Sequence, residues 1–98
     1  MHAAADSFLL ERWRKTHDAE AFAQLAAPYA GLVYAACRRV LGNDTEAEDV
    51  TQECFLSLAQ KAPRNVQPLG PWLYTVATHS ATELAVDLAA LDTLFGSI

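Results

Sequence analysis

The residues in this sequence that could carry out chemistry are few and far apart. Histidines stand at His2, His17 and His79, and the chain contains neither an HxxxH nor a CxxC spacing. A metal centre usually needs three or four such ligands at short, regular spacing, so we predict no metal site. No set of His, Cys and carboxylate residues has catalytic spacing either. We therefore predict that the protein is not an enzyme and needs no cofactor.

The two cysteines, Cys37 and Cys54, both lie on apolar faces of expected helices. A cysteine in that setting behaves as a small apolar residue. We expect two buried free thiols rather than a disulfide or a pair of metal ligands.

The stretch best suited to binding is residues 44–62, which reads DTEAEDVTQECFLSLAQKA. On a helix with about 100° per residue, one side carries a core-like set of residues: Ala47, Val50, Thr51, Cys54, Phe55, Leu58 and Ala62. The other side is polar and carries Asp49, Gln52, Glu53 and Gln60, with Leu56 among them. An apolar side chain surrounded by acids and amides is typical of a protein-binding surface. The alternative is a single exposed leucine with no role.

Length and composition predict one all-helical domain. The chain has 98 residues, few glycines and many Ala and Leu residues. Its longest apolar run, residues 25–37, contains Pro28 and Gly31 and is shorter than the roughly 20 residues of a membrane span. No cationic start followed by an apolar stretch and a cleavage site occurs, so we expect a soluble cytoplasmic protein.

The charges are unevenly distributed along the chain. The net charge of -5 argues against non-specific nucleic-acid binding, which needs an excess of Lys and Arg. All seven Lys and Arg residues precede residue 65, and the charged residues from Leu69 onward are Glu83, Asp87 and Asp92.

The helical pattern begins with a short helix within residues 1–17. We expect residues 1–5 to fray, Asp6 or Ser7 to cap this helix, and Phe8, Leu9 and Trp13 to form its apolar stripe with Arg12 between them. Asp18 then caps a second helix that is kinked or restarted at Pro28 and ends at Gly42. Its expected inward residues are Ala19, Phe22, Ala23, Leu25, Tyr29, Leu32, Val33, Ala36, Cys37 and Val40.

Asn43 and Asp44 start the central helix, and residues 62–71 then read as an ordered loop of about ten residues, because they hold three prolines and a glycine. The last helix opens with Pro71 in its first turn. Its inward stripe is Leu69, Trp72, Leu73, Val76, Ala77, Ser80 and Leu84, and its outward residues are Tyr74, Thr75, Thr78, His79 and Thr82. We divide the chain into a short helix at 1–17, a helical domain at 18–86 and a helical tail at 87–98.

This order of elements resembles the region 2 domain of extracytoplasmic-function (ECF) sigma factors of the sigma-70 family. The likeness covers about residues 18–85 and is carried by YAGLVYAACRRVLGN, by DTEAEDVTQECFLSL and, after the proline-containing loop, by PWLYTVAT. It implies an all-α, compact bundle of three to four helices. It also implies a bacterial transcription initiation factor that binds core RNA polymerase and helps to recognise and open the promoter -10 element.

The resemblance assigns two surfaces. Asp49, Gln52, Glu53 and Leu56 correspond to the surface that docks on the clamp helices of the polymerase β′ subunit, which agrees with the helical geometry above. The loop at 62–70 corresponds to one that captures a flipped-out base, although a plain connector is the alternative. The candidate DNA-binding residues are Lys61, Arg64, Asn65, Tyr74, Thr75, Thr78, His79 and Thr82.

The last helix departs from the family pattern. Relatives carry several Arg or Lys residues on its outward face, whereas this chain has Thr75, Thr78, His79, Thr82 and Ala85. Hydroxyl groups release no counterions, so the salt-dependent part of DNA affinity should be small. His79 alone among them can gain a positive charge, and an exposed histidine without a role is the alternative. A rival hypothesis follows: a sigma-like decoy or adaptor that binds an anti-sigma factor or the polymerase without touching DNA.

The tail continues the inward stripe through Leu84, Leu88, Leu91 and Phe95. The helix either runs on to Phe95 or breaks and folds back. An apolar stripe beyond a small domain predicts self-association or a bound partner helix, with packing onto the domain as the alternative. The family's second domain, which reads the -35 element, has no counterpart here, so we expect either a fragment of a longer protein or a stand-alone domain.

Overall fold

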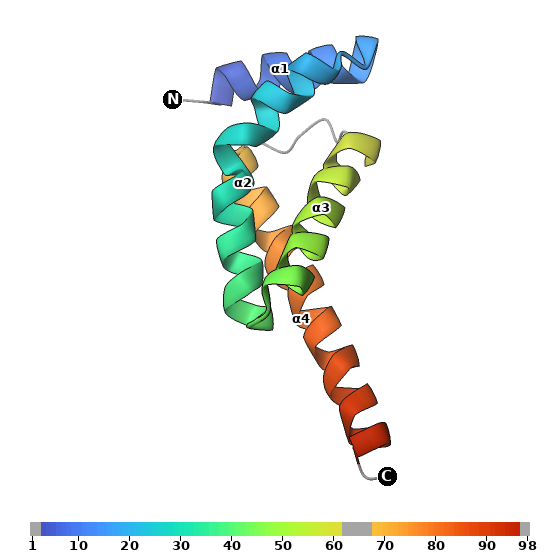
Figure 1. Ribbon diagram of the computed structural model, residues 1–98. Helices are drawn as coiled ribbons and strands as arrows, with labels where there is room; N and C mark the ends of the chain where they lie inside the picture. Colours follow the sequence, from blue (N-terminus) through green and yellow to red (C-terminus); the bar gives the residue numbers. More distant parts are fainter. Residues whose placement is uncertain (1–2, 62–67, 97–98) are drawn as a thin grey trace.

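The computed structural model describes residues 3–61 and 68–96, which form four α-helices and contain no strand. The helices are α1 (Ala3–Thr16), α2 (Ala19–Leu41), α3 (Asp44–Lys61) and α4 (Leu69–Gly96). Figure 1 shows α2, α3 and α4 forming a bundle, with α1 across one end of it and the last turns of α4 projecting from the other. The molecule is therefore elongated, with extents of 53 × 24 × 21 Å. The predicted all-α fold is confirmed.

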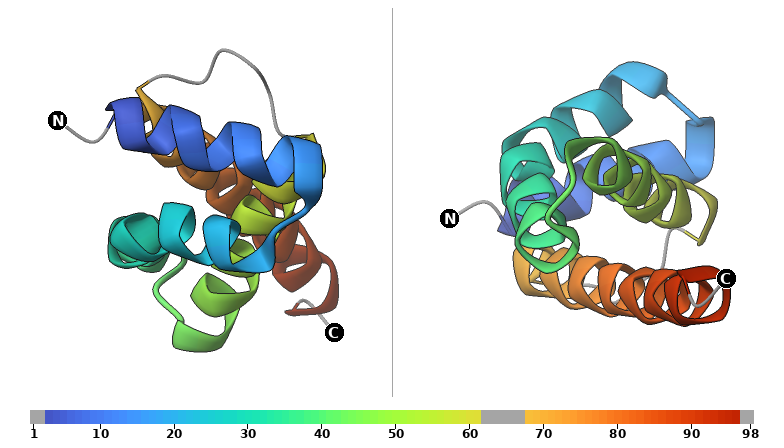
Figure 2. Two further views of the ribbon diagram at one scale, coloured as in Figure 1. Left: turned by 90° about the horizontal axis from the view of Figure 1, so that it is seen from above. Right: turned by 60° about the horizontal axis from the view of Figure 1, so that its bottom comes forward.

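The core lies where α2, α3 and α4 meet. Figure 2 shows these helices from above and from a second direction. The largest fully buried side chains of the core are Leu25, Leu58, Leu69 and Leu73. Trp13 joins α1 to this core, because its indole Nε1 donates a hydrogen bond to the carbonyl oxygen of Ala59 at 2.8 Å. Each of the four helices thus contributes to one apolar interior.

The start of α1 differs from the prediction. The helix begins at Ala3, so Asp6 is no cap but lies inside its first turn, only 5% exposed, and accepts a hydrogen bond from the Tyr29 hydroxyl. Alanine is the best helix former, which explains how the helix extends back through residues 3–5. Phe8 is 64% exposed and not part of the inward stripe, because Asp6, Leu10 and Trp13 occupy the side of α1 that faces the bundle.

The caps of α2 are as predicted. Asp18 accepts a hydrogen bond from the backbone N–H of Glu20 at 3.0 Å, and Gly42 ends the helix with a left-handed φ of 70°. The helix continues through Pro28, and Figure 1 shows it changing direction in its first half. Its inward face is narrower than predicted, because only one side meets α3 and α4. Four residues predicted to face inward are therefore exposed: Ala19, Ala23, Leu32 and Val40.

Helix α4 begins earlier than predicted. Leu69 and Gly70 are already helical, so the prediction that the loop extends to residue 71 is wrong. Residues 62–67 of the predicted loop lie outside the described part of the chain. The first N–H groups of a helix need no intrahelical partner, so Pro71 is tolerated in the first turn. The predicted inward stripe is at least half-buried throughout, and Ala81, which the prediction omitted, is fully buried.

The two cysteines confirm the prediction of buried free thiols. Cys37 on α2 and Cys54 on α3 are both free and buried in the core. Burial raises the pKa of both, that of Cys54 to about 12. Among the residues that the structure describes, none of the helices combines the length and the apolar character needed to span a bilayer.

Candidate functional site

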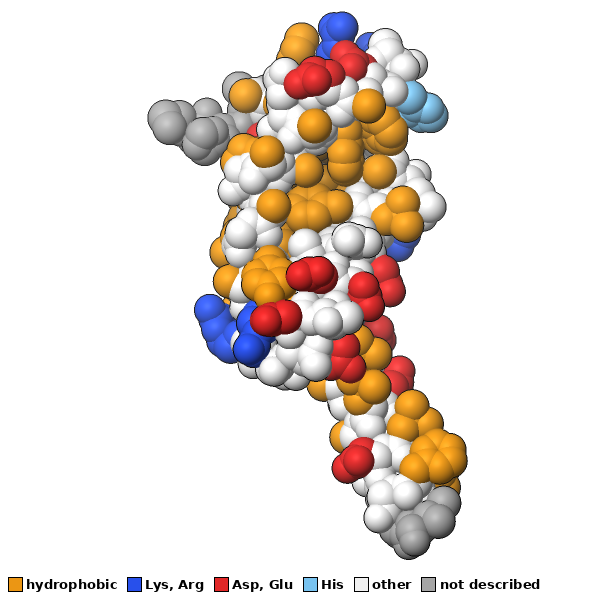
Figure 3. All heavy atoms as spheres, viewed as in Figure 1, with side chains coloured by type: hydrophobic (Ala, Val, Ile, Leu, Met, Phe, Trp, Pro, Cys, Tyr) orange, Lys and Arg blue, Asp and Glu red, His pale blue; other side chains and the backbone are white. Residues whose placement is uncertain are grey.

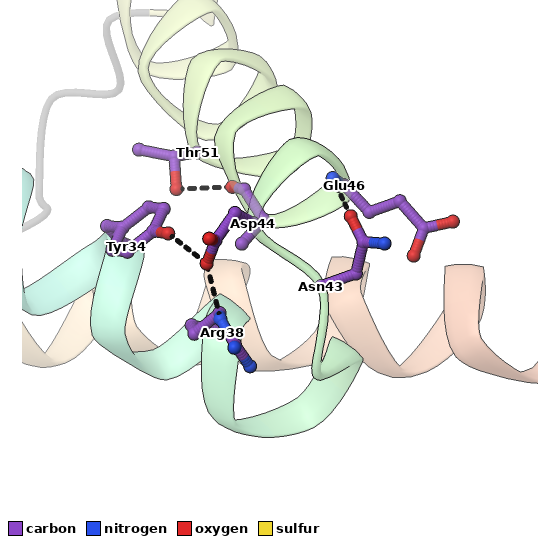
Figure 4. Close-up of polar contacts among 7 residues, drawn as sticks. Tyr34, Arg38, Asn43, Asp44, Glu46 and Thr51 are labelled. Atoms are coloured by element: carbon purple, nitrogen blue, oxygen red, sulfur yellow. Dashed lines mark hydrogen bonds and ion pairs between the residues drawn. The ribbon is translucent and has the colours of Figure 1, made fainter.

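The position of α3 is set by a polar cluster at its junction with α2 (Figure 4). Asp44 Oδ1 accepts a hydrogen bond from Arg38 Nε at 2.6 Å and another from the Tyr34 hydroxyl at 3.0 Å. Asn43 Oδ1 caps α3 by accepting from the backbone N–H of Glu46 at 3.0 Å. The Arg38 guanidinium and the Tyr34 hydroxyl hold the pKa of Asp44 below its usual value. Two residues of the last turns of α2 thereby fix the direction in which α3 leaves the turn.

One face of α3 is buried and the opposite face is exposed. Ala47, Val50, Cys54 and Leu58 pack into the core. Asp49, Gln52, Glu53 and Leu56, which we call the α3 ridge, all lie on the exposed face, as predicted, and Leu56 is 54% exposed. Thr51 and Phe55 are half-buried at the boundary between the two faces, and Ala62 lies outside the described residues.

The surroundings of Leu56 are negative. Figure 3 shows acidic side chains gathered over the first half of α3, on the face turned towards the viewer. A partner that covers the α3 ridge would therefore meet one apolar side chain beside the carboxylates of Asp49 and Glu53, with the Gln52 amide as a neutral hydrogen-bonding group. Such a surface suits a partner with complementary cations.

The predicted DNA-binding residues fall into two groups. Lys61 is exposed at the end of α3, and Arg64 and Asn65 lie outside the described residues. On α4, Tyr74, Thr75, His79 and Thr82 are exposed and Thr78 is half-buried, so these five share the outward side of one helix. We call them the α4 face.

Two side chains of the α4 face already have partners. The Thr78 hydroxyl donates to the backbone carbonyl oxygens of Tyr74 and Thr75, at 2.9 and 3.1 Å. His79 Nε2 lies 3.2 Å from Glu83 Oε2, one turn further along α4. A protonated His79 would therefore be partly neutralised by this carboxylate, which weakens its attraction for phosphate.

A groove of about 420 Å³ between α3 and α4 links the two surfaces. Its lining includes Glu53 from the α3 ridge, Thr75 and His79 from the α4 face, and Lys61 at the end of α3. Hydroxyl groups and apolar side chains complete it: Ser57, Ser80, Cys54, Trp72 and Val76. Sequence reasoning did not find this groove, because Ser57 and Ser80 carry no signal until the crossing of α3 and α4 is known. The two surfaces predicted separately are neighbours.

Comparison with known proteins identifies the family. The family model for sigma-70 region 2 matches residues 25–88, which include the α3 ridge and the α4 face. The ECF RNA polymerase sigma factor SigW of Bacillus subtilis (strain 168) is 37% identical over 71 residues, which make up 66% of this chain and 36% of that protein. The chain thus spans only about a third of this relative's length. No solved structure gives a significant match.

The family match covers most of the bundle, including all of α3 and the larger parts of α2 and α4. It begins after α1 and ends before the last turns of α4. The chain therefore belongs to the sigma-70 region 2 family, and the relative named above places it with region 2 of ECF sigma factors.

Proposed function

We propose that this domain acts in bacterial transcription initiation as region 2 of an ECF sigma factor. It docks through the α3 ridge on the clamp helices of the β′ subunit of core RNA polymerase and contributes to recognition and melting of the promoter -10 element. The observation that carries the proposal is the exposure of Leu56 between acids and an amide, on a helix whose opposite face is buried.

The α3 ridge has the features of a helix-on-helix contact. Leu56 supplies an apolar side chain that loses exposed area when a partner helix covers it, and Asp49 and Glu53 supply charges that select a cationic partner. Since α3 is anchored by its N-terminal cap and by the core, its exposed face needs little reordering on binding. The α3 ridge is therefore preorganised for docking.

Substitutions in the α3 ridge should weaken binding to a β′ clamp-helix fragment. We expect Leu56→Asp to lower the affinity about thirtyfold, since losing a central interface side chain costs about 2 kcal/mol. Glu53→Lys should weaken binding and slow association, because it reverses a charge that steers the partner. Biolayer interferometry with the immobilised fragment measures both effects.

Glu48→Lys is the matched control for Glu53→Lys. Glu48 is also an exposed acid of α3, but it lies about 140° around the helix from Glu53, outside the α3 ridge. Glu48→Lys should leave the affinity for the β′ fragment within about twofold of the wild type. Because Leu56 and Glu53 are exposed, circular dichroism should show unchanged folding. Unchanged binding after both ridge substitutions would exclude docking by this face.

Promoter contact is proposed for the groove between α3 and α4 and for the residues around it. The groove brings Lys61 together with Thr75 and His79, and Arg64 and Asn65 follow Lys61 closely in the sequence. The hydroxyl and imidazole groups there can hydrogen-bond to phosphates and base edges. Trp72 lines the same groove and offers an aromatic surface for stacking a base.

A second candidate function is a sigma-like decoy or adaptor that binds an anti-sigma factor or the polymerase without binding DNA. One observation favours it: the chain has no Lys or Arg from Leu69 onward, and His79, the residue of the α4 face that can become cationic, lies beside Glu83. A phosphate backbone would therefore meet little positive charge on α4.

Fluorescence anisotropy with a single-stranded -10 oligonucleotide at low salt separates the two functions. If the domain contacts the promoter, it should bind the -10 oligonucleotide measurably and bind a scrambled oligonucleotide more weakly. Lys61→Glu should weaken the binding further. The decoy function predicts no sequence-dependent binding in the same titration. A helical circular dichroism spectrum shows that the protein is folded in either case.

A further inference from the structure

The apolar seam of α4 continues beyond the bundle. Residues at alternating steps of four and three along the helix share one side, the spacing of the a and d positions of a coiled coil. These residues, which we call the α4 seam, are Ala77, Ala81, Leu84, Leu88, Leu91 and Phe95. An ideal helix drifts only about 20° per heptad from this repeat, so the six side chains stay on one side over this length.

Burial along the α4 seam falls steadily towards the C-terminal end. Ala77 and Ala81 are fully buried, Leu84 and Leu88 are half-buried, and Leu91 and Phe95 are 50% and 61% exposed. Figure 1 shows the cause: α4 runs past the ends of α2 and α3, and no other described helix accompanies its last turns. Figure 3 shows hydrophobic side chains on this projection. The seam thus continues an internal packing interface into open space.

Acids flank the exposed part of the α4 seam. Asp87 directly precedes Leu88 and Asp92 directly follows Leu91, so the two carboxylates occupy a g and an e position, on opposite sides of the seam. Both are exposed. In coiled coils these positions determine which partner helix is accepted, because they face the partner's own e and g residues.

The charges select against a second copy of this chain. Two α4 helices paired through their seams would bring the Asp87 and Asp92 carboxylates of both copies together, in either orientation, and residues 69–98 contain no Lys or Arg to offset them. We propose that the exposed part of the α4 seam is a docking surface for a partner helix with an apolar a/d stripe flanked by Lys or Arg. The partner continues the seam as a heterotypic coiled coil and covers Leu91 and Phe95.

Two synthetic peptides test this proposal. Both are about three heptads long with Leu at the a and d positions, and they differ only in carrying Lys or Glu at all e and g positions. Anisotropy of the labelled peptides with the full chain should show that the Lys peptide binds about tenfold more tightly than the Glu peptide at low salt. The difference should shrink as salt rises.

Variants of α4 test whether peptide binding depends on the α4 seam and on its flanking acids. Leu91→Asp should abolish binding of the Lys peptide. Val86→Asp is its matched control, because Val86 is 62% exposed on the same helix but lies on the side opposite the α4 seam, and it should leave binding unchanged. The double variant Asp87→Lys with Asp92→Lys should reverse the preference in favour of the Glu peptide.

Three outcomes would overturn the proposal: no binding of the Lys peptide, equal binding of both peptides, or loss of binding in Val86→Asp to the same degree as in Leu91→Asp. Light scattering provides a separate check. A dimer of the unmodified chain that Leu91→Asp dissociates would make a second copy the occupant instead. Leu91→Asp should keep its affinity for the β′ fragment, so this test is independent of the docking proposed for the α3 ridge.

Discussion

Tyr29 connects three helices through a single side chain. Its hydroxyl donates a hydrogen bond to the buried carboxylate of Asp6 on α1, while its own backbone belongs to α2. Its ring lies against the first turn of α4, where a Cβ added to Gly70 would be only 3.3 Å from Tyr29 Cε1. The hydrogen bond to Asp6 is the largest cause that raises the pKa of Tyr29 from 10.0 to about 12.

This raised pKa predicts a loss of stability in alkali. Tyr29 ionises more easily in the unfolded chain, so its contribution is fully present below pH 10 and is lost as the pH rises from 10 to about 12. Tyr29→Phe should destabilise the protein by about 1–3 kcal/mol at neutral pH, since it leaves the Asp6 carboxylate buried without this donor. Urea denaturation at several pH values measures both effects.

The exposed Tyr74 provides the matched control for this prediction. Tyr74→Phe should leave the neutral stability and the alkaline loss close to those of the wild type. In Tyr29→Phe, by contrast, the loss between pH 10 and 12 should be smaller. An equally steep alkaline loss in both variants would show that other groups cause it.

At the scale of the elements, replacing glycine by alanine should have opposite effects on stability at Gly31, within α2, and at Gly42, the C-cap that follows it. Gly42 ends the helix at a φ of 70°, whereas Gly31 lies within the helix, and a Cβ at either position would meet no atom within 4 Å. Gly42→Ala should destabilise the protein by about 1–2 kcal/mol through backbone strain. Gly31→Ala should stabilise it by about 0.5–1 kcal/mol, because alanine loses less entropy in a helix. Thermal unfolding followed by circular dichroism compares them, and the same sign for both would contradict the prediction.

Helix types and caps could be predicted from the sequence because they depend on neighbours in the chain. Asp18, Gly42 and Asn43 act as caps through hydrogen bonds to residues four or fewer positions away. The exposure of the α3 face that carries Leu56 could be predicted from the helical period alone. The same reasoning failed for Leu32 and Val40, because which side of α2 is covered depends on where α3 and α4 cross it. It failed for Asp6 because its partner, Tyr29, is 23 positions away.

At the scale of the whole molecule, the charge distribution separates the proposed partners. The net charge is -5, every Lys and Arg precedes residue 65, and the α3 ridge and the end of α4 are acidic. Cationic protein surfaces are therefore favoured over DNA as partners of these two regions. In the anisotropy titration with the -10 oligonucleotide, few counterions are released, so the logarithm of affinity should fall with the logarithm of salt concentration with a slope of only about one to two.

The buried free thiols of Cys37 and Cys54 make it possible to measure how often the folded core opens. The thiolate is the form that attacks an alkylating reagent. Inside the folded core the raised pKa values disfavour the thiolate, and burial keeps the reagent away from the sulfurs. Reagent reaches these buried sulfurs when the helices packed around them separate. The rate of iodoacetamide labelling therefore measures how often the packed helices open. A ligand that stabilises the bundle would lower this rate without contacting either cysteine.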